Sequence, residues 1–308
     1  MNTPRIGLAL GSGSARGWAH IGVIHALKEY GIKPDVVTGA SVGALVAAAY
    51  ASGQLDVLET WVRQLTRTDV WRLLDTTFRG GGMMRGNRLM RAIGEQIKDL
   101  PIEELPVPFA AVAADLETGQ EVWLRQGPML SAVRASSGFP GMFTPMWHQD
   151  RWLIDGGVVN PVPVSLCRAL GADFVIAVNL NTQLSKHPKY QRRLTRAKNS
   201  ENAPKPEDGQ EDGSWTSLDH WSHLVGGLTE VLKSGNAEEP GMFDVMTTSI
   251  NLMQDLITRS RMVGDPPSVH ISPFLGDFHL MDFHRADEAI AAGRRSVQRV
   301  ADELADLG

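Results

Sequence analysis

The sequence of 308 residues contains a single cysteine, Cys167, so no disulfide can form within the chain. Small secreted proteins held together by disulfides are excluded, and a reducing compartment is expected. Basic residues are not in excess either: 30 Lys and Arg stand against 35 Asp and Glu, a net charge of −5. Because nucleic-acid binding requires basic side chains that neutralise phosphates, we expect no nucleic-acid partner.

Long hydrophobic runs are also missing. The longest apolar stretch, Val42 to Tyr50, falls far short of the ~20 residues that span a bilayer. The apolar run near the start, Ile6 to Leu10, is shorter than the roughly 7–15 residues of a signal-peptide core. These two absences predict a cytoplasmic protein.

Up to about residue 180, short apolar runs alternate with segments of helical spacing. The pattern predicts helices at 16–30 and 42–52 and strands at 6–10, 35–38, 109–116, 121–124, 152–154 and 174–178. Strands separated by helices of this length favour a mostly parallel, doubly wound α/β sheet.

The composition changes at 182–214, where large apolar side chains are almost absent and a basic run precedes an acidic one. We expect a flexible polar insertion there, either simply solvated or making transient contact with an anionic membrane surface through its basic half. Helices are predicted at 218–232, 242–262 and 284–304, and a strand at 269–271. The second of these helices has an apolar face, for which core packing is the favoured interpretation over lipid entry or dimerisation. We predict one domain over 1–308.

A G-x-S-x-G motif at Gly39–Gly43 lies between a predicted strand and a predicted helix. This is the context of a nucleophile elbow, in which a serine occupies a sharp turn whose glycine neighbours avoid steric clashes. The helix that follows favours negative charge developing at its N-terminus. The motif therefore makes Ser41 the candidate nucleophile.

The segment Gly11–Gly17 (GSGSARG) closes the first strand and opens the first helix, so its backbone N–H groups can converge on an anion. Its spacing differs from a dinucleotide fingerprint, and it lacks the Lys-Ser/Thr ending of a P-loop. An oxyanion hole for acyl transfer fits better. Phosphate binding remains the alternative.

Asp155-Gly156-Gly157 follows the strand predicted at 152–154. An aspartate at the end of a strand lies where open α/β sheets bind ligands, although Asp-Gly turns are common without function. A serine nucleophile normally needs a histidine base, and His270, His279 and His284 follow Asp155 in segments expected to be ordered. The residues alone leave a Ser-His-Asp triad open. No His, Cys or carboxylate cluster has metal-ligand spacing, so no metal or organic cofactor is expected.

Taken in order, SGSARG (12–17), GASVG (39–43) and DGG (155–157) resemble the motifs of the patatin-like phospholipases, the group that includes neuropathy target esterase. The segment 135–145 (ASSGFPGMFTP) is similar to the stretch between serine and aspartate in that family, and the C-terminal part resembles bacterial RssA-type members. The resemblance implies a three-layer α/β/α fold with a mostly parallel central sheet. It also implies a Ser41-Asp155 dyad without histidine, and an oxyanion hole at Gly13 and Ser14 with Arg16 nearby. Supporting glycines would be Gly11, Gly17, Gly39, Gly43, Gly156 and Gly157.

This resemblance predicts a serine acyl hydrolase acting on lipid or lysophospholipid esters, with transient contact at the inner membrane face. Phe139, Met142, Phe143 and Met146 are candidates to line an acyl channel, with core packing as the alternative. Outside enzymes, the alternative function is a lipid-binding or regulatory protein that keeps the fold.

Overall fold

A computed structural model of the chain describes residues 4–77, 81–182 and 242–305. The chain divides into two compact units, Met1–Leu184 with Met253–Gly308, and Ser185–Leu252. The predicted insertion at 182–214 and the helix expected at 218–232 lie almost wholly outside the described residues, so the prediction of a single domain stays a prediction. Within the described ranges, no helix is long and apolar enough to cross a membrane.

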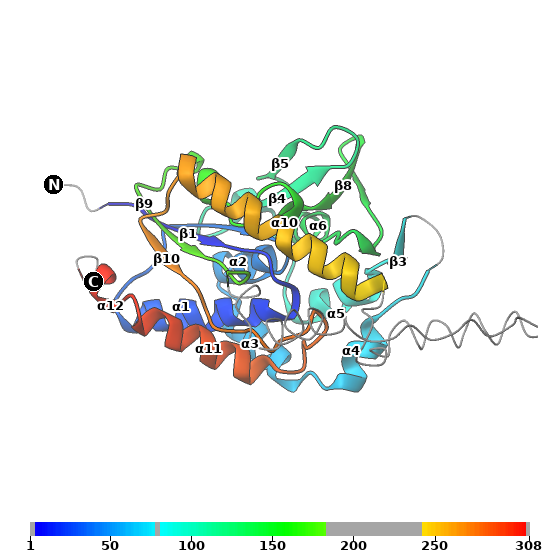
Figure 1. Cartoon of the computed structure of the whole chain (residues 1–308), viewed down its shortest axis with the longest axis horizontal. Helices are drawn as coiled ribbons and strands as arrows, with labels where there is room; N and C mark the ends of the chain where they lie inside the picture. The colour runs from blue at the N-terminus through cyan, green and yellow to red at the C-terminus, as the bar shows by residue number, and fades with distance from the viewer. Residues whose placement is uncertain (1–3, 78–80, 183–241, 306–308) are drawn as a thin grey trace, which may run out of the picture. The chain divides into compact units, whose positions relative to one another are not determined.

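The larger unit is built on an eight-stranded sheet in the order β10-β9-β1-β2-β4-β8-β7, with β5 also paired to β4 (Figure 1). The strands from β10 to β4 run parallel, whereas β5, β8 and β7 are antiparallel to their neighbours. The mostly parallel sheet predicted from the sequence is confirmed. The strands are β1 (Ile6–Leu10), β2 (Val36–Ala40), β4 (Phe109–Asp115), β5 (Glu121–Leu124), β7 (Met146–His148), β8 (Arg151–Asp155), β9 (Phe174–Val178) and β10 (Val269–Ile271), with β3 (Gly82–Met84) and β6 (Gly141–Phe143) as a separate parallel pair.

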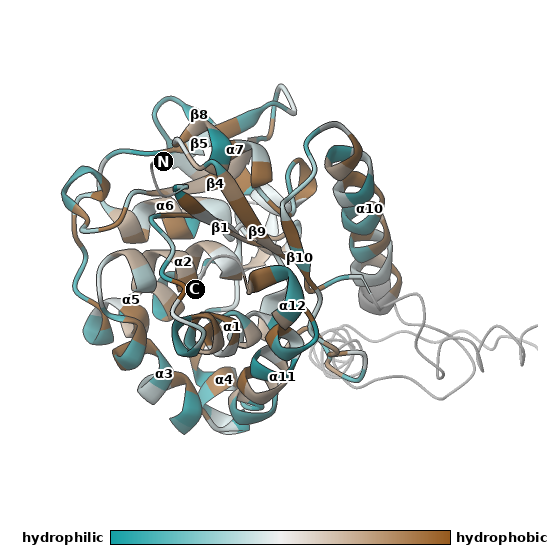
Figure 2. Ribbon diagram, turned by 90° about the vertical axis from the view of Figure 1, so that its left-hand side faces the viewer, coloured by the Kyte–Doolittle hydropathy of each residue, from teal (hydrophilic) through white to brown (hydrophobic). Residues whose placement is uncertain are grey.

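Helices cover both faces of this sheet (Figure 2). Leu8, Leu10 and Ile176 pack in one cluster with α1, α2, α6 and α11, whereas Ala9 and Val175 pack with α7 on the opposite face. The three-layer α/β/α arrangement is therefore confirmed. The helices are α1 (Ala19–Glu29), α2 (Val42–Ala51), α3 (Leu55–Gln64), α4 (Arg67–Leu73), α5 (Asn87–Gln96), α6 (Met129–Ser136), α7 (Val164–Ala169), α10 (Met242–Gly264), α11 (Ala286–Gln298) and α12 (Ala301–Leu304), with 3-10 turns η1 (Ser14–Trp18), η2 (Ile102–Glu104) and η3 (Gly156–Val158).

The helices α1 and α11 pack with almost no space between their backbones. A Cβ added at Gly22 would lie 1.9 Å from the carbonyl oxygen of Ile290, and one added at Gly293 would lie 2.0 Å from that of Ala19. Because each glycine faces the backbone of the other helix, a side chain at either position would force the two helices apart. The helix α1, which follows the glycine-rich segment Gly11–Gly17, is thus fixed by α11.

The part of α10 from Met253 onward reverses the usual amphipathic arrangement. Gln254, Asp255 and Thr258 are buried, whereas Leu256 is 65% exposed and Met253 is also exposed. The interpretation of the apolar face of this helix as a core face is therefore wrong for this part of α10. Of these buried side chains, Gln254 bonds to loops around the candidate site, as described below, whereas Asp255 and Thr258 bond to residues of α10 itself.

Candidate active site

Two strands meet end to end at the candidate site. β5 occupies one edge of β4, so β2 and β8 must share the other edge, β2 opposite Phe109–Val112 and β8 opposite Ala113–Asp115. β2 runs parallel to β4 and β8 runs against it, so their carboxyl ends face each other. Ala40 pairs with Val112 and Asp155 pairs with Ala113. This topology brings the residue after β2, Ser41, to the last residue of β8.

Ser41 occupies the sharp turn between β2 and α2 that its motif predicts. Its backbone has φ 57° and ψ −126°, a conformation that L residues rarely adopt and that functional turns retain at an energetic cost. The hydroxyl donates a 2.6 Å hydrogen bond to Oδ2 of Asp155. The turn can approach β1 this closely because residue 43 is glycine. A Cβ added at Gly43 would lie 2.3 Å from the carbonyl oxygen of Leu10.

Asp155 is completely buried. Burial disfavours its charged form and raises the pKa of the carboxyl from 3.8 to about 6, although hydrogen bonds from Ser41 Oγ and from the Gly157 N–H, 2.7 Å from Oδ1, act in the opposite direction. A carboxylate with this pKa is ionised at neutral pH and still basic enough to take a proton from a hydroxyl in a transition state.

The glycine-rich loop, Gly11–Gly17, comprises the three residues after β1 and most of η1, and most of its backbone N–H groups are already hydrogen-bonded. Those of Gly11, Ser12, Ala15 and Arg16 bond to the carbonyl oxygens of Val178, Pro161, Leu280 and Gly13. Among the described residues, no acceptor is bonded to the N–H groups of Gly13 and Ser14. Two neighbouring unbonded donors are what an oxyanion hole requires, and Ser14 lines the same pocket as Ser41.

Arg16 lies beneath this loop and does not extend into solvent. Its Nε donates to the Gly13 carbonyl oxygen at 3.1 Å, and burial lowers its pKa to about 10, so it stays charged at neutral pH. Ser14 has φ 51°, and its hydroxyl donates to the Leu280 carbonyl oxygen at 2.7 Å. That bond stabilises a serine in a backbone region that glycine adopts more readily.

The other predicted glycines are positions of close approach. A Cβ added to any of them would lie within 2.7 Å of a neighbouring atom; they are Gly11, Gly17, Gly39, Gly43, Gly156 and Gly157. At Gly156 the neighbour is the carbonyl oxygen of Val112, at 2.1 Å. That oxygen lies at the junction of β2 and β8, so a side chain at Gly156 would separate the two strand ends.

Ser41 opens into a pocket whose wall is almost entirely apolar. Its lining side chains come from η1, α2, α3, α4, α5 and α6 and include Trp18, Leu45, Trp61 and Leu89. Phe139, Met142 and Phe143 line it as expected, whereas Met146 does not and packs against the main core instead. A reactive hydroxyl at one end of an apolar pocket suits an ester with a long hydrocarbon chain.

The structure offers Ser41 and Asp155 no histidine partner among the described residues. His284 Nε2 accepts from Arg67, His270 Nε2 lies 3.4 Å from the Ser272 hydroxyl, and the backbone N–H of His279 bonds to Asp282. The only side-chain partner of the Ser41 hydroxyl in this part of the chain is the Asp155 carboxylate. The geometry favours the dyad over a triad.

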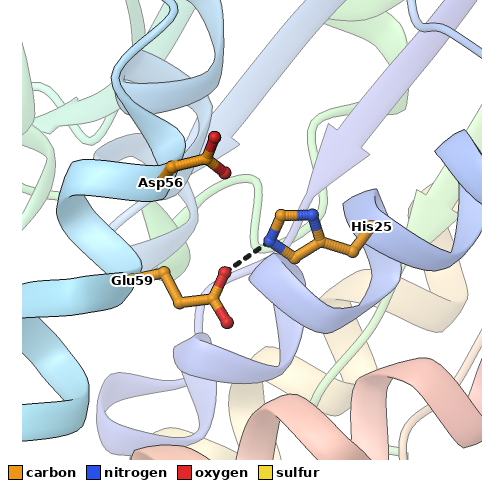
Figure 3. A group of neighbouring side chains, drawn as sticks. All are labelled: His25, Asp56 and Glu59. Atoms are coloured by element: carbon orange, nitrogen blue, oxygen red, sulfur yellow. Dashed lines mark hydrogen bonds and ion pairs between the residues drawn. The ribbon is translucent and has the colours of Figure 1, made fainter.

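One group of possible metal ligands lies between α1 and α3 (Figure 3), and none of its residues lines the pocket. The ligand atoms of His25, Asp56 and Glu59 lie within 4.8 Å of one another. Glu59 already bonds to His25 Nε2 at 2.5 Å and to Arg63 at 2.8 Å, and Arg63 also pairs with Asp287 on α11. Because the guanidinium of Arg63 offsets the charge of Glu59, the group fits an ion-pair network joining three helices better than a cation site.

Sequence reasoning missed three residues that support the site. Ser136 and Gly138 bond to the backbones of Ser41 and Asp155. On α10, Gln254 Oε1 accepts from Ser12 of the glycine-rich loop and from Asn181, both at 3.0 Å. For Ser136 and Gly138, the only sequence signal was that they lie within the segment 135–145, which resembles a segment of the family. Nothing in the sequence distinguishes Gln254.

Similarity to known proteins covers most of the chain. The family model described as patatin-like phospholipase matches residues 8–168. An uncharacterised NTE family protein of Mycobacterium tuberculosis is 32% identical over 95% of this chain and 90% of its own length. Lysophospholipase NTE1 of Pyricularia oryzae is 26% identical over 98% of this chain, which corresponds to 19% of that protein. The crystal structure of VipD from Legionella pneumophila aligns with a TM-score of 0.45 at 13% identity, covering 96% of this chain and 66% of that one, a likeness too distant to bear on the fold.

Proposed function

Since the chain belongs to the patatin-like phospholipase family, we propose that it is a serine acyl hydrolase that cleaves carboxylic esters of lipids through Ser41 and Asp155. The observation that carries the proposal is the 2.6 Å hydrogen bond from Ser41 Oγ to Oδ2 of Asp155, at one end of an apolar pocket. A mycobacterial NTE family relative spans nearly the same length, and a fungal relative is named a lysophospholipase.

The first half of the proposed reaction makes an acyl-serine. Asp155 takes the hydroxyl proton as Ser41 Oγ attacks the ester carbonyl carbon, and the N–H groups of Gly13 and Ser14 bind the oxygen that becomes negative. The tetrahedral intermediate then collapses. The bond to the alcohol oxygen breaks, and that oxygen leaves with the proton held by Asp155.

The second half releases the fatty acid. Asp155, again a carboxylate, takes a proton from a water molecule that attacks the acyl carbon, and the same two N–H groups stabilise the second intermediate. When this intermediate collapses, Ser41 recovers its proton from Asp155 and the carboxylic acid departs. No step requires a histidine or a metal ion.

The shape and chemistry of the pocket support a lipid acyl group as the bound part of the substrate. The wall beyond Ser41 presents aliphatic and aromatic side chains from five helices, and removing a hydrocarbon chain from water into it is favourable by about 25 cal/mol per Å². An ester with a short acyl group would leave most of this surface unused.

We further propose transient contact with a membrane surface, where such esters reside. The basic half of 182–214, to which the sequence assigned this contact, lies outside the described residues. On the hairpin of β7 and β8, Trp147 and Trp152 are 52% and 43% exposed and pack edge to face at 5.0 Å. Exposed indoles of this kind partition to the bilayer interface. Co-sedimentation with phosphatidylcholine vesicles tests this, with W147S and W152S against W71S, an exposed tryptophan on α4.

Labelling with a fluorophosphonate tests the catalytic assignment. The reagent should form one adduct on Ser41, detected by intact mass and peptide mapping, that is absent in Ser41→Ala and forms at least 100-fold more slowly in Asp155→Asn. Ser137→Ala is the matched control, because Ser137 also lines the pocket but its hydroxyl bonds to Val133 of its own helix.

Two results would contradict the proposal. An adduct on Ser41 that forms equally fast in Asp155→Asn would show that Asp155 is not the base. Absence of any adduct, combined with saturable binding of a fatty acid, would favour the alternative function of a lipid-binding protein that keeps the fold.

A further inference from the structure

The C-terminal end of α6 contacts the backbones of both Ser41 and Asp155. The Ser41 N–H donates to Ser136 Oγ at 2.8 Å, and the Asp155 N–H donates to the carbonyl oxygen of Gly138 at 3.1 Å. Ser136 and Gly138, two residues apart, therefore hold Ser41 and Asp155, which are separated by 114 positions in the sequence. The proposed function assigns no role to either acceptor.

The direction of the Ser136 hydrogen bonds is determined by their partners. Its hydroxyl donates to the Val112 carbonyl oxygen at 2.5 Å, which uses its single proton, so the hydroxyl oxygen can only accept from Ser41. Val112 lies where the end of β2 and the end of β8 meet on the edge of β4. Ser136 is completely buried, so water cannot replace it as an acceptor.

The turn at Ser41 depends on this bond. A serine with φ 57° and ψ −126° relaxes toward a common conformation unless its surroundings hold it. Rotation of that turn would swing Cβ, and with it Oγ, away from Asp155 Oδ2. The bond also occupies the Ser41 N–H, so this group does not act as an oxyanion donor, consistent with donors on the Gly13–Ser14 side.

We propose that Ser136 is a positioning residue that holds the Ser41 turn against the end of β4 and so keeps the nucleophile within hydrogen-bonding distance of its base. The inference rests on the proposed function. It assigns Ser136 a part in the chemical step and none in binding the acyl chain, since Ser136 does not line the pocket.

Ser136→Ala removes the acceptor and leaves the pocket wall intact. Because a misplacement of about 1 Å at a catalytic group costs roughly 100-fold in rate, we expect kcat and the fluorophosphonate labelling rate to fall about 10- to 100-fold. KM for a long-chain p-nitrophenyl ester should stay within about twofold. Ser136→Cys, whose sulfur is a weak acceptor, should recover part of the loss. Ser296→Ala is the control, because Ser296 is a buried serine on α11 whose hydroxyl donates to Gly293 of its own helix and which does not line the pocket; this variant should match the wild type.

The pH profile separates positioning from a loss of folded protein. The hydrogen bond from Ser41 lowers the pKa of Asp155, so a weakened bond should move the acid limb of kcat/KM in Ser136→Ala to higher pH. A smaller folded fraction lowers the rate at every pH and moves no limb. Kinetics are measured well below the melting temperature of each variant.

The inference is overturned if Ser136→Ala keeps kcat, labelling rate and acid limb at wild-type values, or if KM rises while kcat does not change. An equal loss in Ser296→Ala would also overturn it. If the wild type itself is not labelled at Ser41, the proposed function fails. If it is labelled and Ser136→Ala is labelled equally fast, only the positioning role fails.

Discussion

The ring of His20 lies directly behind the glycine-rich loop, with Nε2 2.7 Å from the carbonyl oxygen of Gly11. A carbonyl only accepts, so Nε2 carries the proton, and Nδ1 is buried with no hydrogen-bond partner among the described residues. Burial lowers the pKa of His20 to about 4. A buried neutral histidine therefore supports the glycine-rich loop. A buried carboxyl with a raised pKa, that of Asp155, bonds to the Ser41 hydroxyl.

These two groups predict opposite effects of pH on stability. His20 contributes stability that is complete above pH 6.5 and is lost as the pH falls toward 4, because only the unfolded chain binds the proton in that range. Asp155 contributes stability that is complete below pH 3.8 and is lost as the pH rises through about 6. Between pH 7 and pH 4, the free energy of unfolding of Asp155→Asn should fall by about 2 kcal/mol relative to wild type.

His20→Gln should show the opposite change in stability to Asp155→Asn in the same experiment. Its free energy of unfolding should rise by about 3 kcal/mol relative to wild type over the same range, since the protonation penalty of the buried ring is gone. Urea denaturation at several pH values gives both differences, and comparison with wild type cancels the surface carboxylates. Curves of the three proteins that run parallel would contradict the prediction.

The pKa of Asp155 also predicts the pH dependence of the reaction. To act as the proposed base, Asp155 must be ionised, so kcat/KM should be constant above about pH 7 and fall tenfold per pH unit below about pH 6. Initial rates on a soluble ester between about pH 4.5 and about pH 9 test this, because carboxyl and histidine side chains titrate within that range. An acid limb near 3.8 would mean that the base is not a buried carboxyl.

Glycine and alanine at position 41 should separate the strain of the turn from the loss of the hydroxyl. Both Ser41→Gly and Ser41→Ala remove the hydrogen bond to Asp155, but only glycine adopts φ 57° and ψ −126° readily. Ser41→Gly should therefore be more stable than Ser41→Ala by about 1–2 kcal/mol in urea denaturation. At Ser52, which ends α2 with φ −86°, alanine should be at least as stable as glycine. Equal stabilities at position 41 would show that the turn stores no strain.

Filling the pocket should shorten the acyl chain that the protein accepts. Leu89 on α5 lines the pocket and is only partly buried, so Leu89→Trp can enter the space with little disturbance of the core. Turnover of a hexadecanoyl ester should fall about tenfold or more, and that of a butanoyl ester less than about twofold. Leu89→Met keeps the volume and should change neither rate. An equal loss for both esters would mean that the substitution acts on the dyad and not on the acyl site.

The sequence predicted individual strands better than the way they are assembled. β1 was predicted with its observed bounds because a parallel strand buried on both faces appears as an unbroken apolar run, IGLAL. Asp155 was singled out partly because ligands bind at the carboxyl ends of parallel strands. β8 is antiparallel, and Asp155 reaches Ser41 because two strand ends meet on β4, a relationship that no local pattern encodes. Closeness to RssA-type members stays a prediction.

Other features escaped prediction because they depend on contacts made only in the folded chain. The helix expected at 16–30 starts as the 3-10 turn η1, since Ser14 and Ala15 bond to Leu280. The helix expected at 284–304 is interrupted between α11 and α12. Gln254 lies on a helix whose apolar residues suggested the opposite buried face, and its own side chain is buried where it bonds to the loop at Ser12.

The glycine-rich loop takes its support from residues that are synthesised long after it. Ser14 bonds to Leu280 and Trp18 to Phe283, 266 and 265 positions later, and α1 packs against Gly293. During synthesis, Ser41, Ser136 and Asp155 all leave the ribosome more than a hundred residues before Leu280 does. The nascent chain thus carries the proposed nucleophile and base long before the glycine-rich loop makes these contacts. On the proposed function, we therefore expect ester hydrolysis to begin only after α11 has packed against α1.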